Sequence, residues 1–387
     1  MPSAKEALEN ESKARTAAWR ALSQVRRNPN RPVLDLGKYL INPRPKLPSG
    51  PLLIIVGDVH LSPRPTVARS EEEDWYEAQA GPLRQIRALK ADLEQEWESS
   101  HGIDIAYVGD IFHKPSYSSE VINFALEELP GGFVIPGQHD LPYHRFDYLY
   151  KSCLWTLIQS GLLKLLDAQS EGEHYERYWN TKVVLWGYGW DRALVSRIPP
   201  ASVRKKRKKE AEEYYNDGHL HIALAHRYIW MEGASFPKAD KKQHFTNYEK
   251  KLLQGYHLAF FGDNHIGFEA AGVTTWGPNK IVNCGSIINR NIDQRYYAPH
   301  IHIVCRNGEV VAYPLDVSQD KWISDEKEGV LRETIGSVLD SLSSEEFSRL
   351  KREYPNFIEV LRMVIRRKGL SKGVRTILVD LVEHCDE

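Results

Sequence analysis

The sequence contains few cysteines, and none of them forms a recognisable motif. Four occur in 387 residues, at Cys153, Cys284, Cys305 and Cys385, and no two are spaced as C-x-x-C. Zinc ribbons and disulfide frameworks need clustered or regularly spaced cysteines, so neither is indicated as the basis of the fold. We therefore expect a reducing, cytoplasmic setting.

Long apolar runs are also missing. A membrane-spanning helix needs about 20 mainly apolar residues, and no stretch comes near that length. The first marked apolar run begins only at Leu52, and nothing before it has the pattern of a signal peptide. We expect no membrane partner.

An excess of charge of one sign is absent as well. The formal net charge is −1, so the chain as a whole is not expected to attract nucleic acid, and any such binding must come from local patches. A hydrophobic content of 42% with 27% charged residues is that of an ordinary globular protein.

Composition divides the chain into three regions. Residues 1–49 are basic and proline-rich, with ten Lys/Arg against four Asp/Glu. They form either an arm that contacts phosphates or a partner, or an extension packed loosely on the core. Residues 50–316 alternate between strand and helix patterns, which predicts one α/β domain. Residues 317–387 contain three short amphipathic patterns and form a predicted helical C-terminal region, which could pack on the core or bind a partner.

Hydrophobic periodicity places the elements of the α/β domain. The strand candidates are residues 52–56, 103–108, 132–135, 182–186, 219–225, 257–261, 272–276, 281–283, 300–305 and 309–314. The helix candidates are residues 76–97, 118–128, 145–159, 206–215 and 246–253. Short connections between the last strands predict that this part of the sheet structure is antiparallel.

Polar side chains follow five of these strands directly, and four of the five sets come after a glycine. They are Asp58 and His60, Asp110, Gln138 with His139 and Asp140, His226, and Asp263 with His265. Open α/β sheets bind their ligands at the carboxyl ends of strands. Oxygen and imidazole groups from several loops can hold two divalent ions about 3.5–4 Å apart, as phosphoryl transfer requires. No thiolate is offered, which favours Mn²⁺, with Mg²⁺, Fe²⁺ or Zn²⁺ also possible.

These residues resemble the five signatures of calcineurin-like metallophosphoesterases, in the family's order. The stretch Gly109-Asp110-Ile111-Phe112-His113 further resembles a signature of SbcD-type DNA double-strand-break repair nucleases. The stretch Gly285 to Arg290 resembles the segment after the last signature of those nucleases, particularly in phage-encoded versions. The resemblance covers residues 50–315 and implies two facing mixed β-sheets flanked by helices.

The resemblance also implies roles for individual residues. The first metal ion would be bound by Asp58, His60 and His265, with Asp110 bridging to a second ion held by Gln138, His226 and Asp263. His139 would stabilise the transition state or protonate the leaving oxygen. Asp140 would orient His139 or cap a loop, and His113 would be either an additional site histidine or a surface residue.

Two of these positions depart from the family pattern, which usually has Asn at the place of Gln138 and His at the place of Asp263. Both residues present can bind a metal ion, but Gln is one methylene longer and Asp adds negative charge. A weakened second site therefore stays open as an alternative.

The function implied is a metal-dependent DNA phosphodiesterase, an exonuclease with possible endonuclease activity, that uses a hydroxide activated by two metal ions. Alternatives are a phosphoesterase for a small phosphodiester or nucleotide, and a catalytically silent nuclease-like scaffold. Similar nucleases form homodimers and recruit an SMC-like ATPase through C-terminal helices, which we expect of residues 330–383. Candidate DNA contacts are Arg204, Lys205, Lys206, Arg207 and Arg290. The aromatic residues Trp186, Tyr188 and Trp190 could stack on bases or pack in the core.

Overall fold

A computed structural model describes residues 46–97, 102–167, 174–178, 182–198, 215, 217–234 and 240–325. The basic run at 204–209, the predicted helix at 206–215 apart from Tyr215, most of the N-terminal extension and the C-terminal region beyond residue 325 lie outside this part. In the described part no helix is both long enough and apolar enough to cross a bilayer.

The first of two mixed sheets has the strand order β12-β11-β1-β2-β3-β4. Strands β1 to β4 pair in parallel, and β11 and β12 add to β1 in antiparallel pairing, as the short connections predict. The strands span Pro51–Val56 (β1), Asp104–Tyr107 (β2), Gly132–Val134 (β3), Leu163–Leu165 (β4), His300–Cys305 (β11) and Val310–Pro314 (β12).

The second sheet has the order β5-β6-β7-β8-β10-β9. Its four inner strands are parallel, and β5 and β9 close the two edges in antiparallel pairing. The strands span His174–Tyr178 (β5), Lys182–Tyr188 (β6), His219–His226 (β7), Leu258–Gly262 (β8), Phe268–Ala271 (β9) and Lys280–Asn283 (β10).

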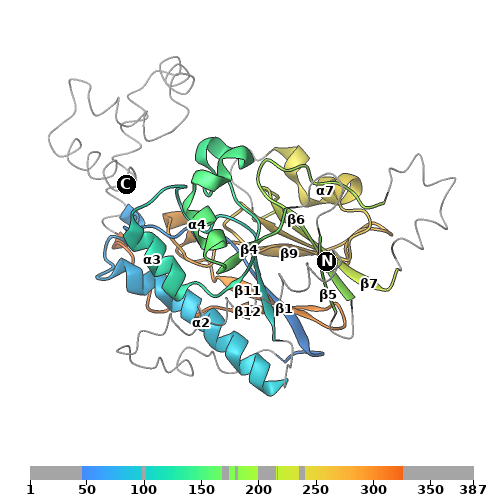
Figure 1. The fold of residues 1–387 in the computed structure, drawn as a ribbon, viewed down its shortest axis with the longest axis horizontal. Coiled ribbons are helices and arrows are strands. Elements are labelled where there is room, and N and C mark those ends of the chain that lie inside the picture. Colours follow the sequence, from blue (N-terminus) through green and yellow to red (C-terminus); the bar gives the residue numbers. More distant parts are fainter. Residues whose placement is uncertain are drawn as a thin grey trace, which may run out of the picture.

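The two sheets face each other, and helices cover their outer faces (Figure 1). Side chains from both sheets, among them Ile55 and Phe260, form the core between them. A second cluster joins the outer face of the first sheet to α2 (Trp75–Glu96), α3 (Ser119–Glu128) and α4 (Cys153–Gln159). A third lies between the second sheet and α7 (Phe245–Leu252). The predicted arrangement of two mixed sheets flanked by helices is confirmed.

Helix α2 shows why these segments fold as they do. The Asp74 side chain caps its start by accepting a hydrogen bond of 3.0 Å from the Glu77 amide. Apolar residues spaced by three and four form its buried stripe, as predicted, and the stripe turns toward the first sheet. Short 3₁₀ turns complete the described structure, at Val67–Arg69 (η2), Pro142–His144 (η3), Phe146–Lys151 (η4), Lys241–Gln243 (η5) and Ile292–Gln294 (η6).

Two predicted elements are wrong. The helix expected over 145–159 is divided, because Ser152 ends η4 and its side chain caps α4 by accepting from the Trp155 amide. The strand expected over 272–276 is a turn. The amides of Val273 and Thr274 donate to the buried carboxylate of Glu249 at 2.7 Å each, so a side chain takes the hydrogen bonds that a sheet would use. The prediction missed β4, β5 and β9.

Candidate metal centre

The carboxyl ends of five strands meet at one edge of the sandwich. Asp58, Asp110 and Gln138 follow β1, β2 and β3 of the first sheet. His226 ends β7, and Asp263 and His265 follow β8, in the second sheet. The Asp263 amide donates to Asp58 Oδ2 at 3.0 Å and thereby joins the two sheets at the site. The sequence-predicted ligands are thus brought together from distant parts of the chain.

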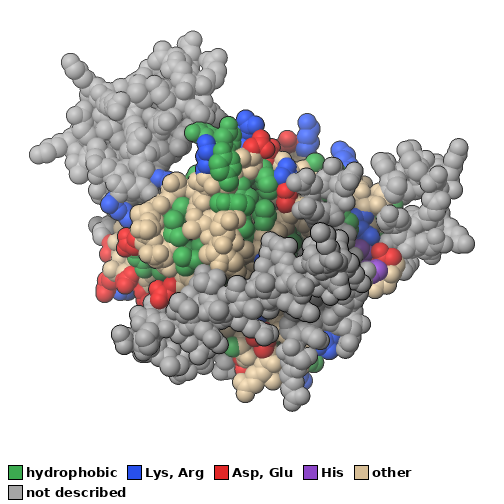
Figure 2. Space-filling view, in the orientation of Figure 1, with side chains coloured by type: hydrophobic (Ala, Val, Ile, Leu, Met, Phe, Trp, Pro, Cys, Tyr) green, Lys and Arg blue, Asp and Glu red, His purple; other side chains and the backbone are tan. Residues whose placement is uncertain are grey.

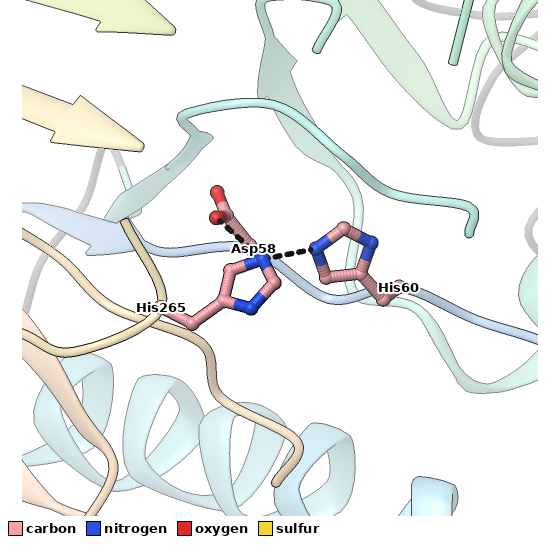
Figure 3. Close-up of side chains that lie close together, drawn as sticks. All are labelled: Asp58, His60 and His265. Atoms are coloured by element: carbon pink, nitrogen blue, oxygen red, sulfur yellow. Dashed lines mark hydrogen bonds and ion pairs between the residues drawn. The ribbon is translucent and has the colours of Figure 1, made fainter. Parts of the chain in front are cut away.

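Asp58, His60 and His265 form one compact group (Figure 3). His265 lies between the other two, with its Nε2 2.9 Å from Nε2 of His60 and 3.9 Å from Oδ2 of Asp58. Their donor atoms lie within 4.8 Å of one another, close enough to share one cation. His60 and Asp58 are buried, whereas His265 is 30% exposed and forms the open side of the group.

Asp110 connects this group to His226. Its Oδ2 lies 3.7 Å from His60 Nε2 and 3.3 Å from His226 Nε2, and both Asp110 and His226 are fully buried. The Nδ1–H of His226 donates to the Val108 carbonyl at 2.7 Å, because a carbonyl can only accept. In the neutral ring, Nε2 therefore turns a lone pair toward the Asp110 carboxylate.

The glycines before these ligands permit the close packing of the loops. A side chain at Gly109 would place Cβ 2.2 Å from the His226 ring, and φ at this position is +111°. At Gly137, Cβ would lie 2.0 Å from Asp110 Oδ1. Both distances are far below a normal contact, so only glycine lets the backbone approach the ligands this closely.

Three candidate ligands themselves adopt the left-handed backbone conformation. The φ values are 54° at His60, 47° at Asp110 and 81° at Asp263. Such conformations are costly for residues with a side chain and tend to occur where the site geometry requires them. This feature has no signal in the sequence beyond the neighbouring glycines.

The donor atoms fit divalent cations. Asp58 Oδ1, Asp110 Oδ2 and His226 Nε2 are buried and have no hydrogen-bond partner of good geometry among the described residues. Buried polar atoms without partners are costly in a protein. Three carboxylates, several imidazoles and a carboxamide, with no thiolate, form a donor set suited to ions such as Mn²⁺, Fe²⁺ or Zn²⁺.

Electrostatics agree with this assignment. Burial raises the pKa of Asp58 well above its usual value, and the nearby Asp110 and Asp263 carboxylates raise it further. Burial lowers the pKa of His60 well below its usual value, so its imidazole stays neutral. Burial also opposes charge on His226 and Asp110, but their mutual attraction prevails, raising the His226 pKa and lowering that of Asp110. The site thus holds a neutral His60 imidazole and an Asp110–His226 pair whose members attract each other, with carboxylates close enough to repel, a repulsion that a bound cation would relieve.

His139 lies at the rim of this group, where it can act on a substrate. Its Nδ1–H donates to the His113 carbonyl at 2.9 Å, so Nε2 is the nitrogen available for proton transfer. Its backbone amide donates to Asp110 Oδ1 at 2.9 Å. The His113 ring stacks on that of His139 with centroids 5.2 Å apart, which places it beside the candidate site, while its role there stays a prediction.

Asp140 serves the loops instead of the His139 ring. Its carboxylate accepts hydrogen bonds of 3.3, 3.0 and 3.0 Å from the amides of Ile111, Phe112 and Gly137. It thus ties the loop after β2 to the loop after β3. Of the two sequence-based interpretations, the geometry matches the loop cap, and the His113 carbonyl orients His139.

The two residues that depart from the family pattern contact each other. The side-chain amide of Gln138 donates to Asp263 Oδ1 at 2.7 Å. The longer Gln side chain therefore reaches the Asp carboxylate. Because only its amide nitrogen is used in this hydrogen bond, the side-chain oxygen Oε1 of Gln138 is left for another interaction. Sequence reasoning treated the two departures separately because nothing local connects them.

Arg290 lies in the wall of the site. It is 6% exposed, and its Nη1 donates to the His60 carbonyl. This position supports the strained His60 backbone, and contact with DNA stays a prediction. The other candidate DNA contacts, Arg204, Lys205, Lys206 and Arg207, lie outside the described residues.

Sequence reasoning missed Asn264, which lies between two candidate ligands. Its buried side-chain amide donates to the carbonyls of Ile229 and Ala234 at 2.9 Å each. It thereby connects the loop that carries His265 to the segment after His226. The position of Asn264, a carboxamide between two candidate ligands, was the signal in the sequence that could have indicated this role.

A third cluster of possible ligands lies at the opposite end of β7, away from this site. Asp217, His219 and His221 have donor atoms within 4.8 Å of one another. However, His221 Nδ1 accepts from Trp186 Nε1 at 3.2 Å, and its Nε2 donates to Asp217 at 2.8 Å. Both ring nitrogens are thus already used, which supports the structural role expected for this histidine.

Comparisons with known proteins give only distant likenesses. The sequence matches no protein-family model, and no curated protein matches it. A 5′-nucleotidase precursor from Thermus thermophilus aligns at 13% identity and a TM-score of 0.35, covering 74% of this chain and 59% of that one. The NAD nucleotidase of Haemophilus influenzae aligns at 13% identity and a TM-score of 0.36, covering 86% and 59%. Similarity at this level establishes neither a shared fold nor a shared activity.

Proposed function

We propose that this protein is a metal-dependent phosphoesterase that hydrolyses phosphodiester bonds, with DNA as its substrate. The observation that carries the proposal is the buried pair of Asp110 Oδ2 and His226 Nε2, which face each other at 3.3 Å across the junction of the two sheets. A carboxylate and an imidazole nitrogen this close in a dry site need a proton or a cation between them: the raised pKa of His226 supplies a proton in the metal-free protein, and a bound cation would take its place. The neighbouring Asp58, His60 and His265 extend the same donor set.

Each residue then has a defined task. Asp58, His60 and His265 would hold one ion, His226, Gln138 and Asp263 would hold a second, and Asp110 would contribute to both. When bound, such ions polarise a phosphoryl oxygen and lower the pKa of water. The Val108 carbonyl fixes the His226 tautomer and so aims its Nε2 at the site.

His139 is the candidate general acid. Its Nδ1–H is fixed on the His113 carbonyl, so a proton on Nε2 can be delivered to the leaving oxygen. Because the His139 amide also bonds to Asp110, this ring keeps a fixed position relative to the candidate ligands. General acid catalysis by a positioned side chain typically raises the rate about 10²–10⁴-fold.

A small nucleotide ester is the second candidate substrate. The net charge of −1 gives the chain no overall attraction to a polyanion, which favours a short substrate over DNA. DNA remains the first proposal because of the resemblance to SbcD-type nucleases in the loop after β2. Comparing hydrolysis of DNA ends, bis(p-nitrophenyl) phosphate and mononucleotides under the same conditions decides between them.

The central test is digestion of end-labelled DNA with Mn²⁺ by the wild type and by Asp110→Asn and His139→Ala. We expect both variants to lose at least about 100-fold in rate, because one lacks the bridging carboxylate and the other the proton donor. DNA binding should be retained in His139→Ala.

Asp104→Asn provides a matched control, since Asp104 begins the same strand at the end opposite Asp110. It should keep wild-type activity. Full activity in Asp110→Asn, or a wild type that binds fewer than two ions and cleaves no ester, would contradict the proposal and favour the silent scaffold.

A further inference from the structure

The loop after β3 exposes aromatic side chains beside the candidate metal centre. Tyr143 in η3 is 79% exposed and Tyr150 in η4 is 58% exposed. Figure 2 shows hydrophobic and cationic side chains together at the top of the molecule, over the green helical turns that follow β3 in Figure 1. Exposed aromatic rings are unfavourable in water, and covering them lowers the free energy.

This loop is fixed to the metal centre. The ring of His144 bonds through Nδ1 to the carbonyl of Gln138 at 2.9 Å, and the Leu141 amide bonds to the same carbonyl. Tyr143 comes four positions after His139, so their Cα atoms lie within about 14 Å even if the chain is fully extended. A group bound at Tyr143 is therefore close to the bond that His139 would help to break.

The backbone conformation of Tyr143 is unfavourable for a bulky residue. Its φ and ψ are 59° and 18°, and His144 follows with φ of 54°. Glycine or asparagine would adopt this left-handed conformation at lower cost. The exposed ring gains no burial that would offset the cost of this backbone conformation, so the strain points to a function of the ring other than stabilising the fold.

Cations flank the aromatic group. Lys151 Nζ lies 5.1 Å from the Tyr148 ring and 5.4 Å from the Tyr150 ring, and the Arg145 guanidinium lies 5.5 Å from Tyr148. The Tyr143 ring meets Tyr148 edge to face at 5.3 Å. Asp147 pairs with Arg145 at 3.0 Å, so Lys151 is the main source of positive charge here. Aromatic faces beside cations are the features that bind the bases and phosphates of single-stranded nucleic acids.

Two of the aromatic candidates from the sequence are used inside the protein. Tyr188 is 1% exposed and bonds to Tyr256, and Trp186 donates to His221. For these two residues the core-packing interpretation of the sequence is the one that the structure matches.

We propose that the ring of Tyr143 stacks on a nucleobase of the substrate next to the phosphoester that is cleaved, with Lys151 attracting the adjoining phosphate. This inference rests on the proposed phosphoesterase function and specifies what the substrate must contain: a base within one or two nucleotides of the reacting phosphorus. Stacking on a base and attraction of a phosphate would bind either the end of an oligonucleotide or a free nucleotide ester.

The test compares an oligonucleotide with one in which the terminal nucleotides carry no base. For the wild type we expect KM to be about tenfold lower for the intact substrate, as one base–aromatic stack provides. In Tyr143→Asn, which suits the left-handed backbone but has no ring, the two KM values should become equal. Tyr143→Phe should keep the preference, as should Tyr296→Asn, which removes another exposed tyrosine.

Binding measured by fluorescence anisotropy in the presence of a chelator separates the two proposals. If the wild type hydrolyses no ester, the proposed function is wrong. The ratio of the Kd of Tyr143→Asn to that of the wild type for the oligonucleotide still tests whether Tyr143 stacks on a base. Equal KM or Kd values in Tyr143→Asn and wild type for the intact oligonucleotide would overturn the inference. If a dinucleotide shows the same loss as the oligonucleotide, a small nucleotide is a sufficient occupant; if not, a longer strand is required.

Discussion

At the scale of single residues, Asp140 holds the candidate metal centre together without facing it. Its carboxylate is buried and accepts from three amides of two loops. We expect Asp140→Asn to lower the free energy of unfolding by about 1–3 kcal/mol, because an amide nitrogen would face backbone donors. Urea denaturation of the metal-free protein measures this. If stability is unchanged while catalysis is lost, Asp140 acts directly on His139 instead.

His302 in β11 provides a pH-dependent contribution to stability. Burial lowers its pKa to about 3, although Glu269 lies 3.5 Å from its Nε2. The unfolded chain takes up this proton near pH 6.5 and the folded protein does not. Stability is therefore full above about pH 6.5 and falls as the pH drops toward 3.

At pH 5 this loss amounts to about 2 kcal/mol, given the difference between the two pKa values. His302→Gln cannot take up the proton, so its thermal unfolding temperature should fall less between pH 7.5 and pH 5 than that of the wild type. An equal fall in both proteins would show that other groups dominate the acid sensitivity.

At the scale of elements, Glu249 decides the structure of the segment before β10. The β-branched residues at 273–275 favour a strand, but the Glu249 carboxylate binds two of their amides and the Thr274 hydroxyl. We expect Glu249→Gln to destabilise the protein by about 1–3 kcal/mol, since the buried side chain then no longer offers a charged acceptor to these donors. Hydrogen exchange should be faster at Val273 and Thr274, and unchanged protection there would contradict this role.

At the scale of the whole molecule, the site exists only where the two sheets meet. Ions bound there would connect loops of both sheets, so binding contributes to the stability of the complete domain. We expect saturating Mn²⁺ to raise the unfolding temperature by several degrees, since binding at 100 times Kd is worth about 2.7 kcal/mol. A chelator should reverse the shift, and Asp58→Asn combined with Asp110→Asn should abolish it. A shift that persists in the double variant would place the ions elsewhere.

Local signals in the sequence account for much of the site. Aliphatic runs such as 52–56 indicate buried strands, and the glycine before Asp58 or Asp110 marks the turn that comes next. The same local rules fail at 272–276, where a distant carboxylate replaces the sheet as hydrogen-bond partner. They also fail to show whether Asp140 orients His139 or caps a loop, since its hydrogen-bond partners lie up to 29 residues away.

The sequence by itself determined most of the strands and the candidate ligands at their ends, because apolar periodicity and glycine turns are properties of short segments, while the two-sheet architecture followed from the resemblance of those signatures to a known family. Only the tertiary structure decided how those ligands are held: the Val108 and His113 carbonyls that set the imidazole tautomers, and the bond between Gln138 and Asp263. These contacts join residues that are distant in the chain, and they form only when packing of the two sheets brings the strand ends together.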